Sequence, residues 1–276
     1  MRLLRIFPRK TKATPMDENV IINQMPTLFD EADQVNISVT FTWDLPRAEK
    51  LYYMWKSVAP AFIGGPALNE IGGEFEPGLY LKNGYTITSR GCPNKCWFCS
   101  VWKRDPELKE LGIKSGYNIT DDNLLACSDE HIKAVFEMLR NQNKPAIFSG
   151  GIEAKRLKQW HVDLLASIRL EELFCAYDTP DDYEPLIVAG KMLREANITL
   201  KNRKARAYVL IGYPSDTFDK ALTRIKQTID AGFFPFAMLW RNDKGEFKRE
   251  WRQFQRQWAN PIITAVNCKN YMRTVI

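Results

Sequence analysis

The sequence predicts an α/β fold, and three observations favour this class. Segments rich in β-branched and apolar residues alternate with amphipathic helical patterns along most of the chain. One segment, ARAYVLIGY (205–213), is largely apolar, which is typical of a parallel strand covered on both faces. The chain has 276 residues, of which 45% are hydrophobic and 26% charged, so it can bury a large core without disulfides.

The first 80 residues are predicted to form a small α/β unit. LLRIF (3–7) has the composition of a short strand within an otherwise irregular stretch, residues 1–35. A strand, a helix and a second strand then follow at 35–43, 45–59 and 61–65. Pro46 falls in the first turn of the helix, where a proline is tolerated. A stretch rich in glycine and proline separates this unit from the rest of the chain.

From residue 84 onward, strands and helices alternate regularly. The predicted strands are 85–90, 117–120, 145–151, 172–178, 205–213 and 233–239. The predicted helices between them are 128–142, with Ser128 as its N-cap, 157–169, 182–197 and 217–232. Six such repeats imply parallel strands with right-handed crossovers, which curl into either an open twisted sheet or a partial barrel. In both, functional residues belong at the carboxyl ends of the strands.

The predicted domain organisation has three parts. Residues 1–80 form the N-terminal unit, 81–242 the six-strand core, and 243–276 a basic C-terminal helix and tail. No apolar run approaches the length of a membrane span, and the N-terminus carries no secretory signal, so a cytoplasmic location and no membrane partner are expected.

The chain is mildly basic, with a net charge of +6. Basic residues cluster at 201–206 and 241–256. Together with Trp251 and Trp258, they suit an anionic or nucleic-acid partner, because basic grooves and stacking aromatics are what such partners require. A basic amphipathic helix that packs on the core explains the same residues more simply, and no known nucleic-acid-binding motif is present.

The segment that carries chemistry is TSRGCPNKCWFCS (88–100), directly after the first core strand. It places Cys92, Cys96 and Cys99 in a C-x3-C-x2-C spacing, which favours a metal site over disulfides in a protein that is not exported. Three thiolates on one loop can hold three irons of a four-iron cluster and leave the fourth iron open. Gly91 allows a tight turn, and Phe98 puts an aromatic ring beside the last cysteine.

At these residues the sequence resembles the radical S-adenosylmethionine (radical SAM) enzymes. The resemblance implies a (β/α)6 partial TIM barrel, and a [4Fe-4S] cluster held by Cys92, Cys96 and Cys99. It also implies that the open iron binds S-adenosylmethionine (SAM), and that reductive cleavage gives a 5′-deoxyadenosyl radical that abstracts hydrogen from the substrate. An electron donor such as a flavodoxin or ferredoxin, and a small-molecule or nucleotide-type substrate, would be the partners.

The resemblance also assigns cofactor-binding roles to residues at the strand ends. Asp122 and Asn123 follow the second core strand, where the family contacts the amino group of SAM; a helix-entry turn explains them equally well. Glu153 follows Gly150 and Gly151 at the end of the third strand, in a Gly-Gly-Glu arrangement like the family's amino-group motif. Either strand can therefore supply the amino-group ligand.

Three further residues complete the expected SAM site. Asp178, after the fourth strand, suits a ribose contact, and a helix N-cap is its alternative role. Ile211 lies in the apolar fifth strand, against which adenine packs in the family, although ordinary core packing also explains it. Arg206 alternates with Tyr208 along that strand, and its guanidinium can pair with the SAM carboxylate if it faces the barrel interior.

Two alternatives remain. The N-terminal unit is similar to the end of a cobalamin-binding α/β domain, which suggests a cobalamin-dependent radical SAM methyltransferase, but it is short and has no histidine to ligate cobalt. A non-catalytic, zinc-stabilised nucleic-acid-binding protein is the other alternative, although zinc prefers four N or S ligands and no second C-x2-C exists. Cys127 and Cys175 are expected to be buried thiols, and His131 and His161 ordinary helix residues.

Overall fold

The computed structural model describes residues 1–70 and 73–274, and its fold class is α/β, as predicted. The chain divides into two compact units. The first unit is Met1–Gly116 with Asp243–Gly245, and the second is Tyr117–Asn242 with the residues from Glu246 onward. The boundary between the two units, at residues 116 and 117, differs from the predicted boundary at residues 80 and 81. The three predicted domains stay a prediction. Among the described residues, no helix has the length and apolar character that crossing a membrane requires.

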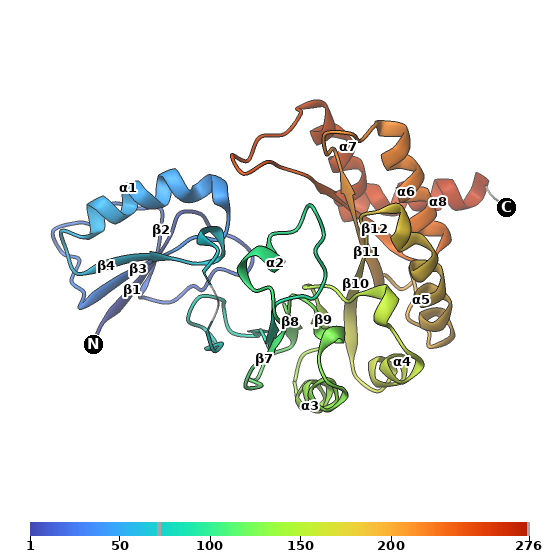
Figure 1. Ribbon diagram of the computed structural model, residues 1–276, viewed down its shortest axis with the longest axis horizontal. Helices are drawn as coiled ribbons and strands as arrows, with labels where there is room; N and C mark the ends of the chain where they lie inside the picture. Colours follow the sequence, from blue (N-terminus) through green and yellow to red (C-terminus); the bar gives the residue numbers. More distant parts are fainter. Residues whose placement is uncertain (71–72, 275–276) are drawn as a thin grey trace. The chain divides into compact units, whose positions relative to one another are not determined.

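The first unit is built on a parallel sheet with the order β2-β1-β3-β4. These strands are β1 (Leu3–Phe7), β2 (Val20–Ile22), β3 (Gln34–Ser38) and β4 (Ala61–Gly64). One helix, α1 (Leu45–Trp55), connects β3 to β4 and lies along one face of the sheet (Figure 1). Its buried residues pack on Leu4, Ile6, Val35 and Ile37, which form the core of this unit. The predicted strand, helix and strand are therefore present, and β2 is an addition within the stretch expected to be irregular.

The opposite face of this sheet is polar. Arg5 donates through Nη1 to the carbonyl oxygens of Gly78 and Leu79 (2.8 and 2.7 Å), and its Nη2 pairs with Asp17. Asn36 donates to the hydroxyl of Tyr80 at 2.7 Å. The segment around residues 78–80 thus satisfies polar side chains where a doubly wound sheet would carry a second layer of helices.

The predicted first core strand is interrupted in the structure. It forms two short strands, β5 (Tyr85–Thr86) and β6 (Ser89–Arg90), and β6 pairs antiparallel with β7 (Lys109–Glu110). The short helix α2 (Val101–Arg104) lies between β6 and β7 in the chain. Residues 91–108, which contain the three clustered cysteines, are therefore an excursion whose two ends are joined by a strand pair.

The second unit contains parallel strands in the order β12-β11-β10-β9-β8. They are β8 (Asn118–Ile119), β9 (Ala146–Phe148), β10 (Leu170–Tyr177), β11 (Ala205–Ile211) and β12 (Phe234–Leu239). Each was predicted, and each is shorter than or offset from its predicted range by a few residues at most. Because β8 pairs with β9, the segment 117–120 does contain a strand, and the Gly-Gly-Glu segment follows the next strand along the chain.

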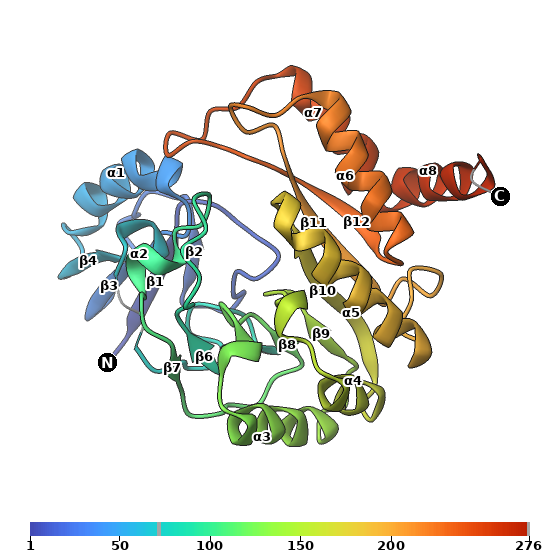
Figure 2. The same ribbon diagram turned by 45° about the vertical axis from the view of Figure 1, so that its right-hand side comes forward.

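Helices connect these strands in turn. They are α3 (Asp129–Arg140), α4 (Gln159–Ala166), α5 (Tyr183–Glu195) and α6 (Phe218–Asp230), and they lie on one side of the row of strands (Figures 1 and 2). Ser128 caps α3 by accepting from the backbone N–H of His131 at 3.2 Å, as predicted. Each of the strands β8 to β11 is therefore followed by a helix on the same side of the sheet. Because the strands are parallel, their carboxyl ends lie along one edge.

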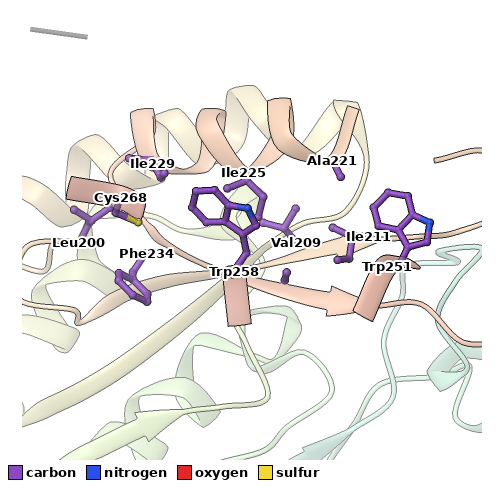
Figure 3. Close-up of a cluster of buried hydrophobic side chains, with 11 residues drawn as sticks. Leu200, Val209, Ile211, Ala221, Ile225, Ile229, Phe234, Trp251, Trp258 and Cys268 are labelled. Atoms are coloured by element: carbon purple, nitrogen blue, oxygen red, sulfur yellow. The ribbon is translucent and has the colours of Figure 1, made fainter. Parts of the chain in front are cut away.

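The C-terminal segment forms two helices, α7 (Glu250–Ala259) and α8 (Pro261–Thr274), so most of the predicted tail is helical. The buried face of α7 carries Trp251 and Trp258, which pack with residues of β11, α6 and β12 (Figure 3). These two tryptophans are core residues, which confirms the simpler prediction of a basic amphipathic helix that packs on the core and leaves neither ring available to stack on a base. The basic residues of α7 lie on its exposed face.

Candidate functional site

The cysteine excursion of the first unit is closed at its base by main-chain contacts. Ser89 and Arg90 pair with Glu110 and Lys109. Gly91 comes next, with a φ of 85°, and a Cβ at this position would lie 2.1 Å from the carbonyl oxygen of Glu107. Only glycine combines this backbone conformation with so close an approach of another segment. The role expected for Gly91 is therefore confirmed: it lets the chain turn into the cysteine loop.

Hydrogen bonds within the loop fix two of the three cysteines. The N–H of Cys99 donates to the carbonyl oxygen of Cys96 at 3.1 Å, and the Trp102 indole donates to the same oxygen at 2.9 Å. The N–H of Val101 points at the Sγ of Cys99, 3.5 Å away. Phe98 lies edge-on to Trp97, with ring centroids 5.4 Å apart, so an aromatic pair stands beside the last cysteine.

The donor set of this loop matches the chemistry of an iron–sulfur site. Cys92, Cys96 and Cys99 are half-exposed and not in disulfides, whereas Cys127, Cys175 and Cys268 are buried, as predicted for the first two. Burial raises the pKa of the Cys175 and Cys268 thiols to about 12, which makes them poor ligands. Across residues 1–70 and 73–274, no three cysteine, histidine or acidic side chains lie close enough to hold a metal ion as they stand. The loop therefore fits an iron–sulfur cluster by the chemistry of its three thiols, and the thiols must move closer together to hold one.

The excursion also contains a buried carboxylate that sequence reasoning missed. Asp105 follows α2 and is fully buried, and its Oδ2 accepts from the Nε of Arg104 at 3.0 Å. Its Oδ1 is buried without a hydrogen-bond partner among the described residues. A single aspartate after a short helix carries no sequence signal that separates it from an exposed residue.

In the second unit, the structure brings together two of the predicted cofactor-binding residues. The Nδ2 of Asn123, after β8, donates to the Oε2 of Glu153, after β9, at 2.8 Å. The same oxygen accepts from the Nε of Arg156 at 2.7 Å. Asp122, the neighbour of Asn123, is half-buried. The ends of the two strands therefore form one polar site, and both predicted amino-group ligands lie in it.

A close approach of main chains makes this site possible. A Cβ on Gly150 would lie 2.4 Å from the carbonyl oxygen of Asp121, and the N–H of Gly150 donates to the carbonyl oxygen of Ile119 at 3.0 Å. Any side chain at position 150 would push the ends of β8 and β9 apart. Gly150 therefore has a packing role, which is compatible with the role expected for Glu153.

Asp178 lies at the end of β10, and its Oδ1 accepts from the backbone N–H of Leu210 in β11 at 3.0 Å. It is not a helix N-cap, because Asp182 takes the side-chain bonds of that turn. Burial, together with the negative charge of Asp182, raises the pKa of Asp178 to about 7, against the opposing hydrogen bond from Leu210 and the positive charge of Arg224. This carboxyl group therefore changes its charge near neutral pH.

A buried ion pair beside Asp178 was not foreseen from the sequence. Asp216, in the turn after β11, accepts from Gly212 N–H and from Arg224 Nη2 of α6, both at 2.8 Å, and Arg224 Nη2 also donates to the carbonyl oxygen of Leu210. The Oδ1 of Asp216 and the Nε of Arg224 are buried and have no hydrogen-bond partner among the described residues. The pair holds the β11–α6 turn closed.

Arg206 and Ile211 lie at opposite ends of β11, the fifth predicted core strand. Arg206 is the second residue of β11, near its amino end, where its guanidinium pairs with Glu172 and stands 4.8 Å from the ring centroid of Phe174. Ile211 is buried in the cluster formed with α6 and Trp251 (Figure 3). Side chains alternate along a strand, so it is Leu210 and Tyr208 that share the other face. Arg206 is therefore far along the strand from its carboxyl edge, and Ile211 has the core packing that also explained it.

The two histidines are buried helix residues, as expected. His131 lies in α3 and His161 in α4. The Nδ1 of His161 accepts from the N–H of Lys158 at 3.0 Å. Burial, with the positive charge of Lys158, lowers the pKa of His161 to about 4, so it is neutral at physiological pH and serves the start of its helix.

A comparison of the chain with models of protein families gave no match, and a comparison with curated proteins gave no significant match.

Proposed function

We propose that this chain is a radical SAM enzyme, and that Cys92, Cys96 and Cys99 hold a [4Fe-4S] cluster. The observation that carries the proposal is the cysteine loop itself: three half-exposed thiols outside disulfides, on one excursion with a closed base. A cluster bound there would supply an open iron for SAM and one electron for its reductive cleavage to a hydrogen-abstracting 5′-deoxyadenosyl radical.

The loop residues have separate tasks in this proposal. The N–H of Val101 stabilises negative charge on the Cys99 sulfur, which lowers the cost of a thiolate. The Trp102 indole holds the Cys96 carbonyl and so limits the orientations of that cysteine. Phe98 and Trp97 place an aromatic pair beside Cys99. Together these contacts reduce the ordering that the loop must undergo when its cluster binds.

The carboxyl edge of the second unit is assigned to SAM. The Glu153 carboxylate, oriented by Asn123, accepts hydrogen bonds from the SAM ammonium group in competition with Arg156. The ionised form of Asp178 accepts from a ribose hydroxyl. The position of α3–α6 on one side of the strands supports a barrel segment over an open doubly wound sheet, which has helices on both faces (Figure 2).

Anaerobic reconstitution tests the proposal. The full chain is treated with ferrous iron and sulfide, and its iron content and absorption are measured before incubation with SAM and dithionite. We expect about four irons per chain, a brown protein, and release of 5′-deoxyadenosine. Cys96→Ala removes a half-exposed ligand and should lose cluster and cleavage, whereas the matched control Cys127→Ala, which alters a buried thiol, should retain both.

Other outcomes identify the alternatives. Full cluster and cleavage in Cys96→Ala would contradict the ligand assignment. A colourless wild-type protein that retains stoichiometric zinc and releases no 5′-deoxyadenosine would favour the zinc-stabilised, non-catalytic alternative. Tight cobalamin binding beside normal SAM cleavage would turn the proposal into a cobalamin-dependent methyltransferase.

A further inference from the structure

The loop between β2 and β3 presents two large apolar side chains to solvent. Leu28 is 100% exposed and Phe29 is 91% exposed. The loop is nevertheless ordered by local bonds: the N–H and hydroxyl of Thr27 both donate to the Oδ2 of Asp30, at 2.6 and 2.9 Å, and Asp30 N–H donates back to the Thr27 carbonyl. A fixed turn that holds two exposed apolar side chains outward is typical of a binding surface.

This turn borders an acidic groove. The groove has a volume of about 650 Å³, and Leu28 lines it with Val58 and the two acidic residues Asp30 and Glu31. No basic side chain is among its lining residues. The bonds from Thr27 lower the pKa of Asp30, so its negative charge is kept at neutral pH. The surface therefore suits a partner that is apolar and basic.

The chain itself carries a segment with this chemistry. The helix α8 contains no acidic residue. Ile262, Val266, Lys269 and Arg273 are all exposed, the first two by 77% and 54%, and their spacing of i, i+4, i+7 and i+11 places them in one stripe. The opposite face of α8 contains the buried Thr264 and Cys268. The outward stripe is therefore an apolar half followed by a basic half.

We propose that the chain self-associates, with α8 of one copy docked against the Leu28–Phe29 turn and acidic groove of a second copy. In this contact Ile262 and Val266 cover Leu28 and Phe29, and Lys269 and Arg273 face Asp30 and Glu31. The apolar part supplies the affinity, since it removes exposed apolar surface from water. The charges select the orientation and accelerate association at low salt. The contact is independent of the cluster and of SAM.

Sedimentation velocity of the full chain between about 1 and 100 µM measures the association, because specific complexes of modest size fall in this range of affinity. We expect the wild type to associate, and to do so more weakly at high salt. The turn variant Leu28→Asp with Phe29→Asp and the stripe variant Ile262→Asp with Val266→Asp should each weaken association tenfold or more. Val188→Asp, at an exposed apolar position of α5, is the matched control and should not change it.

Two combinations identify the partners in the contact. A mixture of the turn variant and the stripe variant should form a mixed complex, because the intact α8 of one faces the intact turn of the other. Lys269→Glu with Arg273→Glu should weaken association, and adding Glu31→Lys, which leaves the Thr27–Asp30 bonds intact, should restore part of it. A wild type that stays monomeric overturns the proposal, as does association that survives either apolar variant. Failure of the mixture to associate points to a turn-to-turn contact and also overturns it.

Discussion

The cysteine loop of the first unit and the carboxyl edge of the second unit are built in different ways. The loop carries half-exposed thiols, and main-chain pairing at its base and the bond from the Trp102 indole to the Cys96 carbonyl help to order it. At the edge, Asp178 and Asp216 are each held by a backbone N–H of β11 or its following turn, and Asn123 holds Glu153. The loop therefore presents half-exposed thiols on an excursion with a closed base, whereas the edge presents carboxylates that are hydrogen-bonded within the protein.

The two regions would therefore differ in how much they must become ordered when they bind a ligand. A loop of thiols gains its final geometry from the group that it binds, so that metal binding and ordering are coupled. An edge whose carboxylates are already hydrogen-bonded is organised before any ligand arrives, which reduces the ordering cost of binding. Substitutions at the edge test whether its polar contacts make it rigid. Substitutions in the loop test whether its geometry depends on the main-chain contacts at its base.

The largest effect is expected for the buried ion pair of the edge. Arg224→Met leaves the buried Asp216 carboxylate without its counter-charge and should lower the free energy of unfolding by about 3–5 kcal/mol. Arg194→Met, at an exposed arginine of α5, should change it by about 0.5 kcal/mol or less. The midpoint of urea unfolding, followed by far-UV circular dichroism, measures both.

A second variant separates lost pairing from lost packing. Adding Asp216→Asn to Arg224→Met removes the unpaired charge while an amide oxygen still accepts from Gly212, so at least half of the lost stability should return. If the double variant is as unstable as Arg224→Met, the pair stabilises the edge through the packing of its side chains and not through its charges. The carboxyl edge would then not be held by electrostatic contacts.

The next effect is a pH dependence that originates in Asp178. The pKa of this carboxyl group is raised from its ordinary 3.8 to about 7 by burial and by Asp182. The folded protein therefore binds a proton more tightly than the unfolded chain. Its contribution to stability is fully present below the unfolded pKa, near pH 4, and is lost as pH rises through 7, a change on the order of 4 kcal/mol.

The test compares unfolding midpoints of wild type and Asp178→Asn between pH 4.5 and 7.5. The asparagine cannot ionise and can still accept from Leu210, so the variant should lose the part of the pH dependence that lies in this window. Parallel pH profiles for the two proteins would show that Asp178 is ionised throughout, and that the edge is less buried than its contacts imply.

Much of the second unit could be predicted from the sequence, because apolar strand segments and amphipathic helical segments alternate along it. The strand β2 was missed, since Val20–Ile22 is only three residues long and stands between loops. Ile211 has the core position that was its alternative role, and its cofactor role stays a prediction. A strand that is apolar at almost every residue gives no sign of which face meets the helices, and a shift of one residue exchanges the faces.

The polar contacts of the edge were harder to predict than its elements. Asn123 and Glu153 were both expected near the cofactor, but their contact depends on how closely Gly150 lets β8 and β9 approach. The pairing of Arg206 with Glu172 joins two neighbouring strands, which no local pattern reveals. Asp216 and Arg224 are common surface residue types, and only their burial in the β11–α6 turn distinguishes them.

A smaller effect is expected in the loop, at Gly91. Gly91→Ala costs about 1–2 kcal/mol for the left-handed backbone conformation alone, and the close approach of its Cβ to the Glu107 carbonyl oxygen adds strain at the base of the excursion. The variant should bind less iron on reconstitution than wild type. Gly73→Ala is the matched control, because a Cβ there meets no atom within 4 Å. Equal iron content in all three proteins would show that the loop geometry does not depend on its closed base.

Glu153→Gln is expected to have the smallest effect on stability. It should have a separate effect on SAM binding. The Glu153–Arg156 pair is partly exposed, so its loss should change the free energy of unfolding by about 0.5 kcal/mol. If Glu153 receives the SAM ammonium group, the same substitution removes a charge-assisted hydrogen bond and should weaken SAM binding about tenfold. Arg156→Gln makes the matched comparison, because it breaks the same pair but leaves the carboxylate available, and it should not weaken SAM binding. Equal weakening by both variants would assign the pair a structural role and leave the amino group of SAM to Asp122 or Asn123.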